Sequence, residues 1–244
     1  MRRLEGKTAV ITGGGSGIGL GAAKRFVAEG AFVYLFGRRQ EALDRAVAQL
    51  GPSARAVSGS VTDPADLDRL YEAVRAERGG LDVLFANAGT GLFAPLGEIT
   101  PEHYDTIFEV NVKGLVFTVQ KGLPLMSEGG SIILTGSTTG VMGTPQFSIY
   151  SASKAAVRNL ARSWALDLKG TGIRVNVLSP GPTLTELAIE VVGEEEFKQL
   201  GAGTPQGRVG DPAETGAVAA FLASSDSSFM TGGEVFVDGG LAQI

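Results

Sequence analysis

The stretch TAVITGGGSGIG, residues 8–19, joins a short run of apolar and β-branched residues to a cluster of glycines. A helical pattern follows, with apolar residues three or four positions apart, and it ends near Gly30. A strand, a glycine turn and a helix in this order are typical of a sheet whose strands run parallel. The opening of the chain therefore predicts an α/β fold.

The same alternation continues through the rest of the chain. Seven runs rich in β-branched or aliphatic residues are expected to form strands, at residues 8–12, 32–36, 54–58, 83–86, 131–135, 174–178 and 234–237. Runs such as VLFA and SIILT lack polar alternation, which is typical of strands buried on both faces. Right-handed crossovers then place helices on both sides. We predict one domain over residues 1–244, a Rossmann-type, doubly wound sheet of seven mainly parallel strands.

Composition narrows the class of protein. Of the 244 residues, 43% are hydrophobic and 19% are charged, and no apolar run is long enough to cross a bilayer. The N-terminal residues lack the apolar core of a secretory signal, so we expect a cytoplasmic location. The net charge of −5 offers no electrostatic surface for nucleic acid. A small-molecule ligand is the favoured partner, without a nucleic acid or a membrane.

The residue types also disfavour several kinds of site. The sequence has no cysteine, which excludes disulfides, thiolate metal sites and cysteine nucleophiles. With His103 as the single histidine, we expect no metal site, and a surface position for that side chain.

The glycine cluster after the first strand is a candidate binding loop. Glycine lets the backbone approach a pyrophosphate, and the free N–H groups and dipole of a helix N-terminus favour an anion. The spacing GxxxGxG differs from the general GxGxxG fingerprint, and a glycine cluster can also be an ordinary turn. Its position favours a dinucleotide loop that consists of Gly13, Gly15, Ser16, Gly17, Ile18 and Gly19.

The end of the second strand bears on the kind of dinucleotide. An acid there would hydrogen-bond the ribose 2′-hydroxyl of NAD, whereas arginine accommodates the 2′-phosphate of NADP. Gly37, Arg38 and Arg39 stand at this place, and two guanidiniums offer bidentate contacts to phosphate. We predict NADP(H) as the cofactor. The alternative is that an arginine, Arg39 above all, simply begins a solvated helix.

A second candidate site lies in residues 137–154, STTGVMGTPQFSIYSASK. Tyr150 and Lys154 are four residues apart, so on a helix they lie on the same face. A neighbouring ammonium favours the phenolate and lowers the phenol pKa from its usual value of about 10. Ser137 would donate a further hydrogen bond to an oxygen that gains negative charge. On spacing alone, a core tyrosine beside a solvated lysine is the more common explanation.

The longest irregular region runs over residues 182–207. A connection of this length in a compact domain is usually a lid or a binding segment, and its middle has the pattern of a short amphipathic helix bounded by glycines. We predict a substrate lid, with an inert surface excursion as the alternative.

Together these motifs resemble those of the short-chain dehydrogenase/reductase family, from the first strand to the last. TGGGSGIG resembles the family's TGxxxGIG loop, NAG its motif after the fourth strand, NVKG its helix asparagine, YSASK its YxxxK pair and PGPTLT its PGxxxT motif. Beyond the glycine loop, the matching residues are Asn87, Ala88, Gly89, Asn111, Ser137, Tyr150, Lys154, Pro180, Gly181 and Thr185.

The resemblance implies hydride transfer between NADP(H) and a carbonyl or secondary alcohol. Tyr150 would be the general acid and base, Lys154 would lower its pKa and bind the nicotinamide ribose, and Ser137 would stabilise the substrate oxygen. Asn111 would hold a helix kink and a water that links Lys154 to solvent, and the remaining motif residues would bind the cofactor. The family's enoyl reductases have a longer Tyr–Lys interval, so carbonyl reduction is favoured. The family usually forms tetramers, and we expect a homotetramer.

The chain departs from the family after the third strand, where an aspartate commonly holds the adenine amine. Gly59, Ser60 and Val61 stand there, so Ser60 replaces the acid and Ser60 and Val61 are the expected contacts. Asp63 is better placed as a helix cap, as are Thr100 and Asp211, each of which precedes a proline.

The expected substrate pocket is mostly apolar, which favours a hydrophobic or aromatic ketone or alcohol. Its residues are Leu92, Phe93, Thr138, Thr139, Val141, Gln146 and Phe147, with Leu184, Leu187, Ile189 and Val192 from the lid. We expect Arg208 to pair with neighbouring acids rather than with a substrate. The alternatives are an NAD-preferring enzyme, a reductase of 3-oxoacyl thioesters, and a dinucleotide sensor without turnover, which would have no need of the proton-handling residues.

Overall fold

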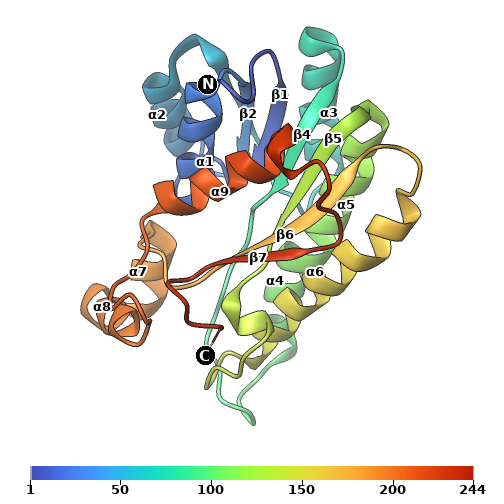
Figure 1. The fold of residues 1–244 in the computed structure, drawn as a ribbon. Coiled ribbons are helices and arrows are strands. Elements are labelled where there is room, and N and C mark those ends of the chain that lie inside the picture. Colours follow the sequence, from blue (N-terminus) through green and yellow to red (C-terminus); the bar gives the residue numbers. More distant parts are fainter. Residues whose placement is uncertain (1, 244) are drawn as a thin grey trace.

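The computed structural model describes residues 2–243, with one seven-stranded sheet and helices on both of its faces (Figure 1). The strand order is β3-β2-β1-β4-β5-β6-β7, and all neighbouring strands in this sheet are parallel. The strands are β1 (Thr8–Thr12), β2 (Phe32–Gly37), β3 (Ala54–Ser58), β4 (Leu81–Ala86), β5 (Met126–Thr135), β6 (Arg174–Pro180) and β7 (Glu234–Val237). The predicted doubly wound sheet is confirmed. Positions 1 and 244 of the predicted domain lie outside the described residues.

Several helices begin directly after a residue whose side chain accepts a hydrogen bond from a first-turn N–H group. The helices are α1 (Gly17–Ala28), α2 (Gln40–Leu50), α3 (Pro64–Arg78), α4 (Pro101–Phe108), α5 (Leu115–Gly122), α6 (Ser148–Asp167), α7 (Glu186–Val192), α8 (Glu194–Ala202) and α9 (Pro212–Ala223). Asp63, Thr100 and Asp211 each precede a proline and accept a hydrogen bond from a backbone N–H, which confirms the expected caps. None of the helices within residues 2–243 combines the length and apolarity needed to cross a membrane.

Two apolar clusters hold the helices against the two faces of the sheet. Neighbouring residues of β1 divide between them, because successive side chains of a strand point to opposite faces. Ile11 packs with Phe26 of α1 and Leu222 of α9, in the cluster that also includes α2. Val10 belongs to the other cluster, with Val157 of α6 and residues of α3 and α5. Each face is therefore covered by its own set of helices.

The sheet reverses its order at β1, which is hydrogen-bonded to both β2 and β4. In doubly wound sheets, ligands bind at the carboxyl ends of the strands beside such a reversal. Thr12 joins the two sides, because its Oγ1 accepts hydrogen bonds from the backbone N of Asn87 and of Ala88, each at 3.0 Å. Asn87 Nδ2 in turn donates to the carbonyl oxygen of Thr12 at 3.0 Å. These bonds hold the glycine loop after β1 next to the segment after β4.

The predicted lid, residues 182–207, contains the expected helix bounded by glycines, which is α8 between Gly193 and Gly203, and also a helix that was not predicted, α7. Gly193 separates α7 from α8 with φ at +91°, a conformation that residues with a side chain rarely adopt. The glycine inside the amphipathic pattern therefore ends the first helix. Figure 1 shows α7 and α8, in orange, projecting beyond the sheet.

Helices α1 and α9 approach each other at two glycines. A Cβ atom on Gly21 would lie 2.5 Å from the carbonyl oxygen of Pro212, and one on Gly216 would lie 2.6 Å from the carbonyl oxygen of Gly21. Both helices also pack on the sheet, which limits how far either can move away. This contact sets the position of α1, and with it the position of the glycine loop that precedes the helix.

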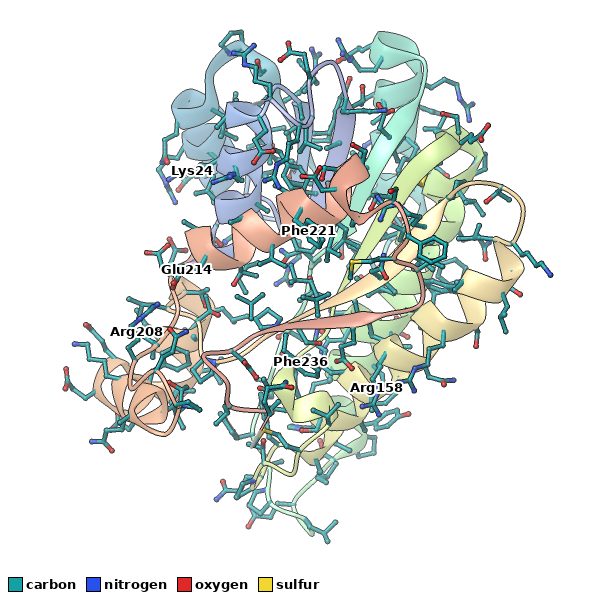
Figure 2. The ribbon with its side chains drawn as sticks, viewed as in Figure 1. Lys24, Arg158, Arg208, Glu214, Phe221 and Phe236 are labelled. Carbon is teal, nitrogen blue, oxygen red and sulfur yellow. The ribbon has the colours of Figure 1, made fainter. Side chains whose placement is uncertain are left out.

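We predict that Gly21→Ala lowers the free energy of unfolding by about 1–3 kcal/mol, because the added methyl group must displace one of the two helices. At an unconstrained helix position the same substitution would raise that free energy by about 0.5–1 kcal/mol, so the sign is diagnostic. Urea unfolding followed by circular dichroism measures the change. Lys24→Ala, on the exposed side of α1 (Figure 2), is the control. An unchanged or increased free energy of unfolding for Gly21→Ala would contradict the close contact.

Candidate active site

Tyr150 and Lys154 come together near the start of α6, beside the end of β5. They lie one helical turn apart, as predicted, and the Lys154 ammonium is 5.5 Å from the centroid of the Tyr150 ring. Lys154 is 3% exposed, and its Nζ donates to the carbonyl oxygen of Thr135 at 2.9 Å. This hydrogen bond fixes the first turns of α6 against the end of β5.

Ser137 follows β5 and is also buried. Its Oγ accepts hydrogen bonds from the backbone N of Thr139 at 3.2 Å and from Thr139 Oγ1 at 3.1 Å, at the start of a 3₁₀ turn over Thr138–Gly140. Ser137 also interacts with the Tyr150 phenol, and this hydrogen bond acts to lower the phenol pKa.

Burial shifts the pKa of the two titratable groups in opposite directions. It lowers the pKa of Lys154 to about 8, because the charged ammonium loses hydration. It raises the pKa of the Tyr150 phenol, and the hydrogen bond from Ser137 offsets only part of that rise. From the effect of the Lys154 ammonium alone, the sequence predicts a lowered pKa for Tyr150. The net direction is opposite because desolvation of the phenolate dominates, and because the ammonium donates to Thr135 instead of to the phenol.

Asn111 lies in a π-helical segment, Glu109–Gly114, that interrupts the path from α4 to α5. Its side chain is fully buried. The Oδ1 atom accepts from the backbone N of Thr90 at 2.8 Å, and Nδ2 donates to the carbonyl oxygen of Thr90 at 2.9 Å and to Ser153 Oγ at 3.1 Å. The asparagine therefore joins the segment after β4 to α6, next to Lys154.

The glycine loop has the form that a bound phosphate requires. Gly13 and Gly17 have φ at +66° and +51°, and Gly19 packs against the carbonyl oxygen of Gly13. Ser16 precedes α1 in an extended conformation, and its side chain makes no capping hydrogen bond to the helix. The first N–H groups of α1 are therefore open to an anion, and these residues fit the pyrophosphate of a dinucleotide. Gly15 packs on α2 and Ile18 on the first apolar cluster.

The two arginines after β2 differ in their surroundings. Arg38 is exposed beside Gly37. Arg39 Nη2 donates to Ser16 Oγ at 3.0 Å and lies 3.4 Å from a carboxylate oxygen of Glu186, the first residue of α7. Arg39 therefore lies near the glycine loop, and both arginines follow the end of β2, where the sequence predicts the adenosine ribose.

Ser60 and Val61 are engaged in the loop after β3. The Ser60 hydroxyl is 2.8 Å from Thr62 Oγ1, and the backbone N of Ser60 donates to a carboxylate oxygen of Asp66 at 2.8 Å. Val61 is buried against Gly114 of the π-helical segment. Asp66 is a carboxylate that the sequence reasoning missed, because it lies within α3 instead of directly after the strand.

The PGxxxT residues reach the glycine loop from the other side of the site. Pro180 ends β6, and a Cβ atom on Gly181 would lie 2.6 Å from the Cα of Asp238, so only glycine fits there. Thr185 caps α7 by accepting from the backbone N of Ala188 at 3.1 Å, and it lies against Gly17. The segment after β6 therefore begins next to the predicted phosphate site.

Many of the expected pocket residues are apolar and exposed. They include Leu92, Phe93, Val141, Leu184, Leu187 and Ile189. Thr138 is buried, and Gln146 and Phe147 precede α6, where Phe147 stacks on the Tyr150 ring. Arg208 forms two hydrogen bonds with Glu214, at 2.8 and 2.7 Å, which confirms the expected pairing (Figure 2).

Other contributors to the site could not be recognised from the motifs. The carbonyl oxygen of Thr135 and both backbone groups of Thr90 act through the main chain, which carries no sequence signal. Ser153 contributes a hydroxyl to Asn111, and its only signal is its place one residue before Lys154.

Comparison with known proteins agrees with this geometry. A family model described as enoyl-(acyl carrier protein) reductase matches residues 13–242. The chain is 64% identical over 246 residues to the oxidoreductase asL5 of Sarocladium schorii, with 100% of this chain and 99% of that protein covered. It is 36% identical over 245 residues to the NADP-dependent (R)-specific alcohol dehydrogenase of Lentilactobacillus kefiri, with 98% and 97% covered.

A solved structure shows the same fold. The 3-ketoacyl-(acyl-carrier-protein) reductase of Brucella melitensis, complexed with NADH, is similar with a TM-score of 0.91 at 33% identity, and the match covers 98% of this chain and 99% of that one. The fold and the site together define an oxidoreductase built on a dinucleotide-binding sheet. The chain belongs to the short-chain dehydrogenase/reductase family.

We predict that Lys154→Met raises the free energy of unfolding at pH 7 and that this gain shrinks at pH 10. Below about pH 8 the ammonium is charged in the folded and the unfolded chain, so its burial destabilises the fold fully. As pH rises from 8 toward 10.5, the folded chain loses the proton first and the penalty disappears. The difference in the free energy of unfolding between Lys154→Met and wild type should therefore narrow by about 2 kcal/mol between pH 7 and 10.

Urea unfolding at the two pH values measures this difference. Lys24→Met, which removes an ammonium from an exposed position of α1, is the control and should stay within about 0.5 kcal/mol of wild type. A constant difference between wild type and Lys154→Met at both pH values would show that the buried ammonium does not titrate in this range.

Proposed function

We propose that the protein is an NADP(H)-dependent alcohol dehydrogenase or carbonyl reductase that acts on a hydrophobic or aromatic ketone and the corresponding secondary alcohol. The observation that supports it most is the grouping of Tyr150, Lys154 and Ser137 beside Asn111 at the carboxyl edge of the sheet. A protein that only sensed a dinucleotide would need no such set of proton-handling side chains. The bound nicotinamide supplies or accepts the hydride, and the chain supplies orientation and the proton.

In the proposed reduction, Tyr150 donates its phenolic proton to the carbonyl oxygen, and in the oxidation it takes the proton back. Ser137 donates a hydrogen bond to the same oxygen as that oxygen gains negative charge. The raised pKa of Tyr150 suits reduction, because it keeps the phenol protonated at neutral pH. For oxidation the phenol must ionise, which positive charge on Lys154 and on oxidised nicotinamide favours.

The proposed proton path continues from Tyr150 through Lys154 and Asn111 to solvent. With a pKa of about 8, Lys154 can release and regain a proton near neutral pH. Gly89 lies beside both groups: a Cβ atom there would be 3.3 Å from Asn111 Oδ1 and 3.6 Å from Lys154 Nζ. Because Gly89 has no side chain, it leaves space beside these two groups for the proposed water. Lys154 would also bind the nicotinamide ribose.

The preference for NADP(H) rests on the arginines at the end of β2. Arg38 is exposed, and Arg39 is held near the glycine loop by Ser16, so both could meet a 2′-phosphate. The relative from Lentilactobacillus kefiri is described as NADP-dependent. The Brucella melitensis reductase was solved with NADH, so an enzyme that prefers NAD is the alternative.

The apolar, exposed residues of segments 92–93, 141–142 and 184–189 support a hydrophobic or aromatic substrate. In the proposal, α7 and α8 act as the lid, hinged at glycines such as Gly193. We also propose that the protein is a homotetramer, which is the usual oligomeric state of the family. We propose a cytoplasmic location as well. A reductase of 3-oxoacyl thioesters is the second candidate, favoured by the likeness to the Brucella melitensis structure.

Steady-state assays of the purified protein over a panel of carbonyl compounds test the proposal. The panel contains aryl ketones, cyclic ketones, a 3-oxoacyl thioester and an enoyl thioester, each with NADPH and with NADH. We expect the highest kcat/KM for an aryl or cyclic ketone with NADPH. Tight NADPH binding without turnover of any compound would favour the sensor, and turnover of the enoyl thioester alone would contradict carbonyl reduction.

We predict that Tyr150→Phe lowers kcat by about 10²- to 10⁴-fold while NADPH binding stays within about twofold, since only the proton donor is removed. Stopped-flow absorbance and NADPH fluorescence titration measure the two quantities. Tyr104→Phe, at an exposed tyrosine of α4, is the matched control. Retention of most activity in Tyr150→Phe would exclude this phenol as the proton donor.

We predict that Arg38→Asp shifts the ratio of kcat/KM for NADPH to that for NADH by at least about tenfold toward NADH. The carboxylate repels a 2′-phosphate and can accept a hydrogen bond from a 2′-hydroxyl. Arg45→Asp, the same change at an exposed position of α2, controls for the altered net charge. Equal cofactor ratios in wild type and Arg38→Asp would refute the phosphate contact.

A further inference from the structure

Three aromatic rings stack in a row that ends at the proposed proton donor. The Phe147 ring lies between those of Phe93 and Tyr150, with 4.3 Å between centroids on each side and interplanar angles of 24° and 26°. Phe147 immediately precedes α6, and its carbonyl oxygen accepts from the backbone N of Ser151 at 2.9 Å. Phe93 comes from the segment after β4. The row therefore connects that segment to the helix that carries Tyr150.

The backbone around the row adopts a conformation that is otherwise avoided. Gln146, next to Phe147, has φ at +61°, and no other residue except glycine has a positive φ within residues 2–243. Its carbonyl oxygen accepts from the backbone N of Ala94 at 2.8 Å, which joins the two loops. A Cβ atom on Gly91 would lie 2.9 Å from Phe147 Cζ and 3.3 Å from Tyr150 Cδ2. All three features keep the Phe147 ring on the Tyr150 ring.

We infer that Phe147 is a positioning residue for the Tyr150 phenol, and that Phe93 supports the Phe147 ring from its other face. A stacked neighbour restricts rotation of the phenol ring, so its oxygen stays near Ser137. The inference rests on the proposed function, to which it adds a residue that positions the proton donor.

Phe147→Leu tests the positioning role, because it removes the flat ring and keeps an apolar side chain. We expect kcat for an aryl ketone to fall by about 10- to 100-fold with the NADPH dissociation constant unchanged, and Phe147→Tyr to restore most of kcat. Tyr104→Leu is the matched control, since Tyr104 stacks on Phe108 at 4.4 Å in α4, and it should keep the wild-type kcat. An unchanged kcat in Phe147→Leu overturns the positioning role.

A spectroscopic readout tests the same role without turnover. With 3-fluorotyrosine incorporated, the fluorine resonance of Tyr150 is assigned by its loss in Tyr150→Phe. Ring currents of Phe147 should displace this resonance, so it should move in Phe147→Leu and stay in place in Tyr104→Leu. A resonance that does not move in Phe147→Leu overturns the stack in solution. If wild type reduces no carbonyl but the resonance moves as expected, the proposed function fails and the positioning of Tyr150 stands.

Discussion

The buried amide of Asn111 is the constraint on which the arrangement of the site depends. It bonds to both backbone groups of Thr90 and to Ser153 Oγ, so the segment after β4, the π-helical segment and α6 meet at one side chain. A buried polar group left without its partner costs about 1–3 kcal/mol, so these segments are held together firmly. Ser153 precedes Lys154 and follows Tyr150 by one turn. The same contact therefore sets where the phenol and the ammonium lie relative to the carboxyl edge of the sheet.

The site keeps features that do not favour stability. Burial of Lys154 lowers its pKa to about 8, and this burial is unfavourable while the ammonium is charged. Gln146 holds a positive φ, and the π-helical segment replaces ordinary helix at Asn111. Unfavourable conformations and desolvated charges gather at functional sites, where the surrounding packing compensates for them. Here the compensation comes from two apolar clusters that cover both faces of the sheet and from the close glycine contact of α1 with α9.

The parts of the structure that local chemistry decides could be predicted from the sequence. Apolar runs located all seven strands, prolines after Asp63, Thr100 and Asp211 marked helix starts, and the Tyr150–Lys154 spacing placed both on one face of α6. The parts decided by tertiary packing could not. The net pKa direction of Tyr150 depends on how deeply the phenol is buried, and the partners of Asn111 include main-chain atoms. Gly193 divides the region after β6 into two helices, which the amphipathic pattern alone did not reveal.

In the proposed reduction, we expect the phenol of Tyr150 to give up its proton in the same step in which the carbonyl carbon accepts hydride. Isotope effects on a single turnover test it most directly: ketone reduction by enzyme-bound NADPH or its 4-deuterated form, each in H₂O and in D₂O. We expect the deuterated cofactor and D₂O each to slow the turnover, and the solvent isotope effect to persist when the deuterated cofactor is used. A hydride isotope effect with no solvent isotope effect would contradict proton donation by Tyr150 in the hydride-transfer step, because the proton would then move in a different step.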